Sequence, residues 1–190
     1  MTVAAILLAA GRSTRFGAAD KVVAPLAGRP LVRHAADTLL ALRLATYHLV
    51  AADPGLACPG YATCVNDAPA AGLSRSIALG VAAARRDGAD AVLIALADMP
   101  LVPLAHFAAL VERWRDTSDA VASSDGGPAM PPALFPAGWF DRLERLTGDR
   151  GARDMLADTT VLPAPAGTLA DIDRTDDLDA IARRLAARGR

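Results

Sequence analysis

Short apolar runs alternate with stretches of helical apolar spacing, and this alternation constrains the possible folds more than any other feature of the sequence. The apolar runs are Ala4–Leu8, Tyr47–Ala51, Ala91–Leu96 and Asp119–Ala122. Helical spacing joins Leu31, Ala35, Leu39 and Leu42 after Pro30, and Leu73, Ile77, Val81 and Ala84. Uninterrupted apolar runs are typical of strands buried on both faces. The sequence therefore predicts the α/β class, as a three-layer α/β/α fold with a mostly parallel, Rossmann-like sheet.

The second half of the chain adds three predicted helices and one unusual segment. The helices are expected over Trp139–Leu146, Asp149–Leu156 and Asp176–Ala187. Between Ser123 and Pro136 the chain is rich in Gly and Pro, which breaks regular structure and favours a shaped loop on the substrate side, with a flexible linker as the alternative.

Composition limits the class of partner. With 190 residues, 53% of them apolar, the chain can bury one sizeable core, and a single domain over residues 1–190 is expected. A formal net charge of −1 argues against a nucleic-acid-binding surface, and no apolar run is long enough to cross a bilayer. Cys58 and Cys64 fit neither a zinc site nor a redox pair, so both are expected to be ordinary thiols. The expected partner is a small anion in the cytoplasm.

The first apolar run ends in a loop suited to phosphate. Small residues follow Leu8 at once, so a ligand can approach the backbone N–H groups, and Gly11 tolerates the backbone angles of a tight anion-holding turn. Arg12, Arg15 and Lys21 supply positive charge. The sequence lacks the P-loop spacing and the dinucleotide fingerprint, and no carboxylate lies where a ribose-binding acid is expected. The alternative for this segment is a solvated loop.

The full string LAAGRSTRFGAADK resembles the signature of the MobA-like nucleotidyltransferases, and its Ala-Ala-Gly form is similar to the molybdenum cofactor cytidylyltransferase branch. Further matches occur in the same order nearly to the end of the chain: Gly72–Ile77, Ala97–Pro100, Pro132–Phe135, Gly148–Arg153 and Asp171–Leu178. The resemblance implies a fold of the nucleotide-diphospho-sugar transferase type. It also implies a nucleotide-binding half over residues 1–100 and an acceptor half over residues 101–190.

Two carboxylates are candidates for a metal site. Asp98 directly follows the apolar run that ends in Ala97, so its carboxylate should emerge at the carboxyl edge of the sheet, beside the phosphate loop. The alternative is an acidic turn residue or a helix cap. Mg²⁺ takes one or two carboxylates together with phosphates and water. The resemblance implies Asp173 as the second ligand and Asp171 as a weaker outer candidate, against a role in capping the last helix, which Thr175 could also serve.

The remaining site residues are expected around the nucleotide and the acceptor. Gly72, Leu73 and Ser74 open a helix whose N–H groups can recognise base and ribose, and Asn66 can read a base edge or serve as a turn residue. The nucleotide-binding set is Leu8, Ala9, Ala10, Gly11, Arg12, Ser13, Asn66, Gly72, Leu73 and Ser74. Asp149 and Arg153 are the acceptor-binding candidates. Pro131 stands where the family often carries a histidine, so any phosphate or pterin contact of that histidine is either lost or supplied elsewhere, with Arg153 as the candidate.

No nucleophilic constellation accompanies these residues. His34, His48 and His106 have no serine, cysteine or metal-spaced partner and are expected to be packing or surface residues. Nucleotidyl transfer needs no general base, because a phosphomonoester is mostly dianionic at neutral pH. The expected reaction is Mg²⁺-dependent transfer of CMP from CTP to the terminal phosphate of molybdopterin, a pterin, with Mn²⁺ as an alternative metal. Arg15, Lys21 and Asp98 are its catalytic residues.

The alternatives concern substrate and class. They are another phosphorylated acceptor, GTP as the nucleotide, or a non-catalytic nucleotide-binding accessory factor for molybdenum enzyme maturation. A molybdenum hydroxylase or its chaperone is the expected protein partner, and neither nucleic acid nor membrane is expected to bind.

Overall fold

The computed structural model describes residues 1–11, 16 and 20–188, with the backbone alone for residues 149–152 and 188. Seven strands form one sheet in the order β5-β4-β1-β6-β8-β7-β9. Their bounds are Val3–Ala9 (β1), Thr46–Ala51 (β4), Ala62–Val65 (β5), Ala91–Leu96 (β6), Val121–Ser124 (β7), Met130–Pro136 (β8) and Thr160–Pro163 (β9). Every pairing is parallel except the two that β8 makes with β6 and β7. The mostly parallel sheet is confirmed.

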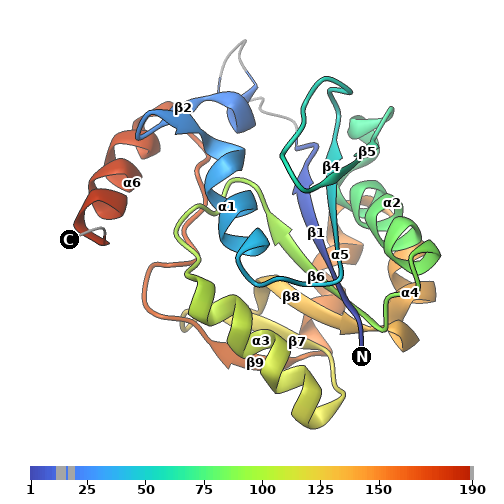
Figure 1. Ribbon diagram of the computed structural model, residues 1–190. Coiled ribbons are helices and arrows are strands. Elements are labelled where there is room, and N and C mark those ends of the chain that lie inside the picture. The colour runs from blue at the N-terminus through green and yellow to red at the C-terminus, as the bar shows by residue number, and fades with distance from the viewer. Residues whose placement is uncertain (12–15, 17–19, 189–190) are drawn as a thin grey trace.

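Helices cover both faces of this sheet (Figure 1). One face carries α1 (Leu31–Leu40) and α3 (Leu104–Thr117), and the other carries α2 (Leu73–Arg86), α4 (Phe140–Glu144) and α5 (Gly148–Ala157). Helix α6 (Thr175–Arg188) lies beside a small hairpin of β2 (Pro25–Leu26) and β3 (Arg29–Pro30). Short 3₁₀ turns span Lys21–Val23 (η1), Pro69–Ala71 (η2) and Ala137–Trp139 (η3). The predicted three-layer architecture is confirmed.

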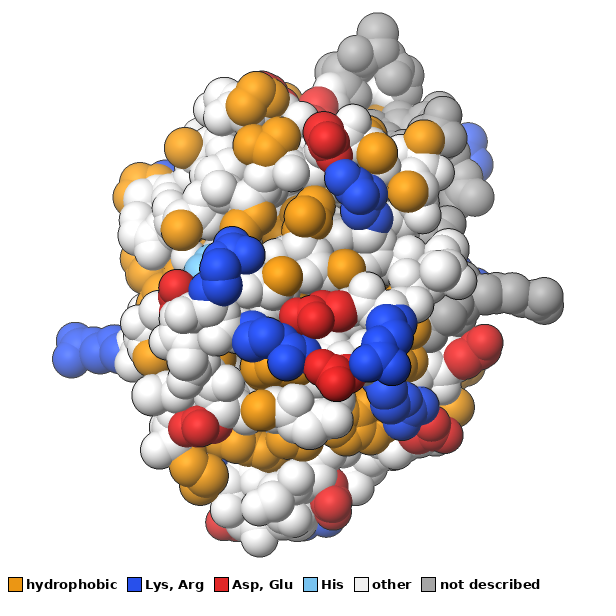
Figure 2. Space-filling view, turned by 90° about the vertical axis from the view of Figure 1, so that its right-hand side faces the viewer, with side chains coloured by type: hydrophobic (Ala, Val, Ile, Leu, Met, Phe, Trp, Pro, Cys, Tyr) orange, Lys and Arg blue, Asp and Glu red, His pale blue; other side chains and the backbone are white. Residues whose placement is uncertain are grey.

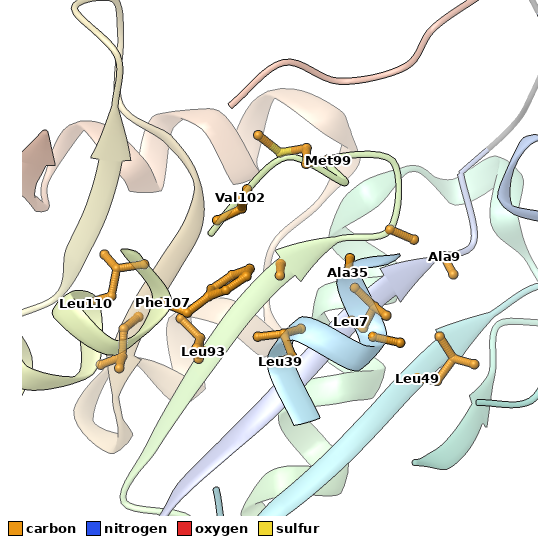
Figure 3. Close-up of a cluster of buried hydrophobic side chains, with 14 of the residues drawn as sticks. Leu7, Ala9, Ala35, Leu39, Leu49, Leu93, Met99, Val102, Phe107 and Leu110 are labelled. Carbon is orange, nitrogen blue, oxygen red and sulfur yellow. The ribbon is translucent and has the colours of Figure 1, made fainter. Parts of the chain in front are cut away.

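Strand β1 is central, and its burial explains its uninterrupted apolar sequence. All seven residues are buried, and alternate side chains enter opposite cores: Leu7 packs with α1 and α3, whereas Ile6 packs with α2. Figure 3 shows the first of these cores, with Leu39 of α1 and Phe107 of α3 directed onto the strands. The strand is thus fixed from both sides, which holds its carboxyl end firmly in place.

Helix α2 packs unusually close to the sheet. A Cβ atom built on Gly80 would lie 2.5 Å from Ile6 Cγ2 and 3.2 Å from Val50 Cγ2, so only glycine fits at this contact. The close approach sets the position of the first turn of α2 relative to the ends of β1 and β4.

The prediction of a shaped loop over Ser123–Pro136 was wrong for most of this segment. Met130–Pro136 forms β8, which pairs with β6 and β7. Pro131 and Pro132 have no N–H to donate, and they lie where the register between β7 and β8 shifts, between Ala122 and Ser123. The Ser123 hydroxyl donates to the Pro132 carbonyl over 2.6 Å and so replaces a backbone contact.

Most of the helices and strands predicted from the sequence are present in the structure. The helical stretch predicted from Trp139 begins with η3 and continues as α4, and the strand predicted at Asp119–Ala122 is shifted to β7. Besides β8, the elements that no predicted range covers are α3, β5, β9, the hairpin strands β2 and β3, and the turns η1 and η2. Over the described part of the chain, no helix combines the length and apolar character that crossing a membrane requires.

Candidate active site

The carboxyl ends of β1 and β6 form the base of the candidate site. These parallel neighbours end side by side, and the Ala97 N–H donates to the Leu8 carbonyl over 3.0 Å. Asp98 follows immediately, so its carboxylate stands at the same sheet edge as the segment Ala9–Gly11. The structure thereby brings together the two sequence motifs that were expected to face a common crevice.

A cavity of about 410 Å³ lies over this edge and is called the charged cavity below. It is lined by Leu8, Ala9, Ala10, Gly11, Lys21, Val22, Pro69, Ala70, Gly72, Leu73, Ser76, Leu96, Ala97 and Asp98. Its walls therefore come from β1, η1, η2, the start of α2 and the end of β6. Small side chains dominate, which leaves backbone groups accessible to a ligand.

Lys21 and two aspartates meet at this cavity. Lys21 Nζ lies 2.6 Å from Asp98 Oδ2 and 3.6 Å from Asp173 Oδ1. The lysine and Asp98 side chains are only 13% and 21% exposed, which strengthens their interaction relative to a surface pair. The turn η1 orients the lysine, because Asp20 Oδ1 accepts from the Val22 N–H and the Val22 side chain is buried in the core.

Asp173 reaches the site through a buried neighbour. Ile172 is fully buried and its N–H donates to the Asp98 carbonyl over 3.0 Å. The start of α6 is capped by Asp177, whose Oδ2 accepts from the N–H groups of Asp173 and Arg174. This arrangement assigns the observed capping contacts to Asp177 and leaves the Asp173 carboxylate beside Lys21.

Asp171 adds a third carboxyl group to this neighbourhood. Desolvation and the negative charges of Asp173 and Asp98 raise the pKa of Asp171, while Lys21 opposes the rise. Burial is the largest cause of the rise in this pKa, and the charges of Asp173 and Asp98 add to it, so Asp171 lies within electrostatic reach of both carboxylates.

The carboxylates fit a hard divalent cation. Asp98 Oδ1 is buried and accepts no hydrogen bond from any described residue, so one oxygen of a carboxylate at the cavity lacks a donor. Asp98 and Asp173 are the oxygen donors that Mg²⁺ or Mn²⁺ takes, with phosphates and water completing the shell. The described residues contain no cluster of three or more His, Cys, Asp or Glu side chains arranged to hold a metal by themselves.

The start of α2 forms the opposite wall. Gly72 precedes the helix with φ 91° and ψ −179°, a conformation that is essentially confined to glycine, and both Gly72 and Leu73 line the cavity. The positive end of the helix dipole and its first N–H groups therefore border the cavity. Ser76, which was not singled out from the sequence, lines the cavity, whereas Ser74 is 2% exposed and does not.

Asn66 lies behind the wall. It is fully buried, its Nδ2 donates to Ser76 Oγ, and its Oδ1 accepts from the Ala68 N–H and from Arg75 Nε. These bonds join the end of β5 to η2 and α2. The structure therefore gives Asn66 a part in holding the cavity wall and does not place its amide among the lining groups that could meet a base edge.

Gly11 borders open space in the described part of the chain. Its φ lies outside the positive region, contrary to the expected turn geometry, and no described atom lies within 4 Å of a Cβ built on it. Because Gly11 lines the charged cavity, a side chain there would occupy ligand space. Arg12, Ser13 and Arg15, which were predicted to bind the nucleotide, lie outside the described residues.

A second cavity, of about 510 Å³, adjoins the first and is called the apolar cavity. The two share Leu8, Leu73 and Leu96. Its other walls come from α2, β6, the β7–β8 connection, β8, α4 and α5, and from Arg153 and Asp171, which are its charged lining residues among those described. Arg153 and Pro131, both singled out for the acceptor, face this cavity, and the side chain of Asp149 lies outside the described residues.

The histidines and cysteines stand apart from both cavities. No described wall of either cavity contains a histidine, and the Cys58 and Cys64 thiols are free, with burial raising the pKa of each. Charged side chains also gather on the face that carries α2 and α4, where Figure 2 shows acidic and basic groups interleaved. There Arg85 binds Asp141 and Glu144, so this network joins two helices.

Comparison with known proteins yields one family and several relatives. The family described as the MobA-like NTP transferase domain matches residues 5–164. The chain is 30% identical over 200 residues to "Purine catabolism protein PucB" of Bacillus subtilis, an alignment that covers 95% of this chain and 96% of that protein.

Solved structures share the fold. Rv0371c from Mycobacterium tuberculosis superposes with a TM-score of 0.81 at 19% identity, covering 96% of this chain and 97% of the other. Its complex with manganese gives 0.75 at 21% identity, covering 96% and 99%. CMP:2-keto-3-deoxy-manno-octonic acid synthetase complexed with CTP gives 0.75 at 13% identity, covering 99% and 100%.

Proposed function

Because the chain belongs to the MobA-like NTP transferase family and is a nucleotidyltransferase, we propose that it transfers CMP from CTP to the terminal phosphate of molybdopterin and releases pyrophosphate. The observation that carries the proposal is the meeting of Lys21, Asp98 and Asp173 at the rim of the charged cavity. That cavity offers both signs of charge at one sheet edge, as a metal-bound triphosphate requires.

The charged cavity suits the nucleotide. Lys21 is placed to bind phosphate oxygens, the small residues Ala9, Ala10 and Gly11 admit the ligand to the backbone, and the start of α2 supplies a positive dipole. The Ala-Ala-Gly form of this segment resembles the cytidylyltransferase branch, which supports CTP over GTP. A share in phosphate binding by Arg12, Ser13 and Arg15 remains part of the proposal.

The apolar cavity suits the acceptor. It adjoins the nucleotide site, so an acceptor bound there can present its phosphate across the shared wall at Leu8 and Leu73. Arg153 provides a cation for that phosphate, and Asp149 is proposed to assist it. Pro131 has neither a side-chain donor nor an N–H, so this position supplies no hydrogen-bond donor to the acceptor's phosphate.

The reaction needs positioning and charge rather than a base. An oxygen of the acceptor's terminal phosphate forms a bond to the α-phosphorus of CTP, and the bond from that phosphorus to the β-bridging oxygen breaks, with its electron pair leaving on pyrophosphate. Lys21 binds the phosphates, and the apolar walls exclude water from competing attack. Asp98 and Asp173 would hold Mg²⁺, or Mn²⁺, which lowers the repulsion between the two anions when bound.

Pyrophosphate release tests the proposal. The protein is incubated with Mg²⁺, molybdopterin and each of the four NTPs in turn, with Asp98→Asn as the matched inactive control. We expect release with CTP alone among the nucleotides. Release with GTP, or with CTP and only another phosphorylated acceptor, would change the substrate, and nucleotide binding without release from any acceptor would indicate an accessory factor. A molybdenum hydroxylase or its chaperone is the proposed recipient of the product.

A further inference from the structure

Lys21 is the only lysine in the chain, because the other nineteen residues of the Lys and Arg total are arginines. This single lysine lies at the proposed metal site. Its ammonium group is 2.6 Å from one oxygen of Asp98 and 3.6 Å from one oxygen of Asp173. A protein cation thus bridges the two carboxylates that would hold the divalent cation.

The other groups of the cluster indicate that the two carboxylates can be held in two ways, by Lys21 as here or by a bound cation. Asp98 Oδ1 is buried and receives no hydrogen bond from the described residues, so the lysine engages only half of this carboxylate. An unsatisfied buried oxygen is costly, and a cation with more coordination positions would satisfy it. Asp171 brings a further carboxyl group, so the cluster holds more acidic than basic groups among the described side chains.

We propose that Lys21 is a displaceable occupant of the metal site, which holds Asp98 and Asp173 while the nucleotide is absent and moves to the triphosphate when CTP binds. The inference rests on the proposed nucleotide site and adds a coupling between the binding of nucleotide and the binding of metal at that site. Divalent metal and nucleotide bind together, because the nucleotide draws away the ammonium group that competes with the metal. By linkage, each then raises the affinity for the other.

The choice of lysine follows from this exchange. An ammonium group is a compact point charge on a flexible four-carbon stem, so it can change partners by rotation of its own side chain. A guanidinium group would grip a carboxylate with two parallel hydrogen bonds and release it less readily. All nineteen remaining Lys or Arg positions of the chain hold arginine, and this site alone has the side chain that readily exchanges its partners.

Manganese binding without nucleotide tests the competition directly. Free Mn²⁺ is measured by electron paramagnetic resonance during titration of wild type, Lys21→Met, Lys21→Arg and the control Arg113→Met, which removes an exposed charge from α3. We expect Lys21→Met to bind Mn²⁺ alone about tenfold more tightly than wild type. Arg113→Met should stay within about twofold of wild type, because it leaves Lys21 beside the carboxylates. Lys21→Arg should bind Mn²⁺ alone no more tightly than wild type, because the guanidinium group releases the carboxylates less readily.

Wild-type protein provides the second measurement and needs no substitution. With ¹⁵N-lysine labelling, the chain has a single side-chain ammonium signal, that of Lys21. We expect metal-free CTP to shift this signal and sub-saturating Mg²⁺ alone to leave it in place. Equal Mn²⁺ affinity of Lys21→Met and wild type, or an ammonium signal that CTP does not move, would overturn the inference. Neither result depends on the acceptor, so pyrophosphate release can fail or succeed independently.

Discussion

The charged cavity and the apolar cavity share three leucines but are built in opposite ways. The charged cavity takes half of its lining from two short segments, Leu8–Gly11 and Leu96–Asp98, at neighbouring strand ends. The apolar cavity gathers side chains from strands and helices spread between β1 and the segment before α6. Recognition by charge and backbone can therefore be encoded locally, whereas recognition by shape needs the assembled fold. The following predictions test this contrast, in order of decreasing effect.

The largest effect is expected at Asp98. Asp98→Asn keeps the side-chain volume and the backbone carbonyl that accepts from Ile172, but it removes the charge beside Lys21. Loss of one electrostatic stabiliser costs on the order of 3 kcal/mol in the transition state, so turnover should fall by roughly 100-fold or more. Pyrophosphate release measures turnover, and thermal unfolding checks that the fold is intact. Turnover within twofold of wild type would remove Asp98 from the mechanism.

Two glycines of the charged cavity should respond differently. Gly72→Ala forces a side chain into a conformation with φ 91° and ψ −179°, so the free energy of unfolding should fall by about 1–3 kcal/mol together with CTP affinity. The methyl group of Gly11→Ala meets no described atom within 4 Å, so the free energy of unfolding should not change, while CTP affinity should drop about tenfold because the methyl group fills ligand space. Gly127→Ala, in open space outside both cavities, is the control for denaturation and CTP titration.

A substitution in the apolar cavity should change the KM for the acceptor alone. Arg153→Gln removes the cation facing that cavity, and loss of a charge-assisted hydrogen bond of about 1.5 kcal/mol should raise the KM for the acceptor roughly tenfold. The KM for CTP should not change. Arg183→Gln, on the exposed side of α6, serves as the control. A rise in the KM for CTP of the same size would mean that the two cavities do not divide the substrates.

The smallest effect concerns pH and lies away from both cavities. Burial lowers the pKa of His106 and of His48 below the ordinary value, so the unfolded chain binds protons more readily than the folded one. Stability is complete above the unfolded pKa of about 6.5 and falls below it, by at most about 1.4 kcal/mol per pH unit for each histidine. His106→Gln, which can still donate to Ser123, should flatten this loss in urea unfolding between about pH 5 and pH 7. An unchanged slope would contradict the assignment.

Much of the site could be predicted because its chemistry lies at the ends of recognisable strands. Asp98 follows a fully apolar strand, and parallel neighbours end at one edge, so its meeting with the segment after β1 required only the sheet type. Asp173 is different. The resemblance implied it, but its contact with Lys21 depends on the buried Ile172 and its bond to the Asp98 carbonyl, which no local pattern reveals.

Other roles could not be predicted because one residue type serves several purposes. The amide of Asn66 can read a base or hold a turn, and the three bonds it makes in this structure, to Ser76, Ala68 and Arg75, are contacts of the second kind. Proline composition indicated a loop, yet β8 tolerates Pro131 and Pro132 because the ladder shifts register where they lie. The structural propensity of proline describes that residue alone, whereas the strand pairing of β8 depends on the neighbouring strands.

The sequence by itself determined the α/β class, most of the helices, the central strands and the segment that is proposed to meet the phosphates. These follow from apolar periodicity and from small or charged residues close together in the chain, which are local properties. The tertiary structure alone decided the place of β8, the apolar cavity and the approach of Asp173 to Lys21. Each of these depends on contacts between segments distant in sequence, and such contacts form only when the cores bury the faces that join them.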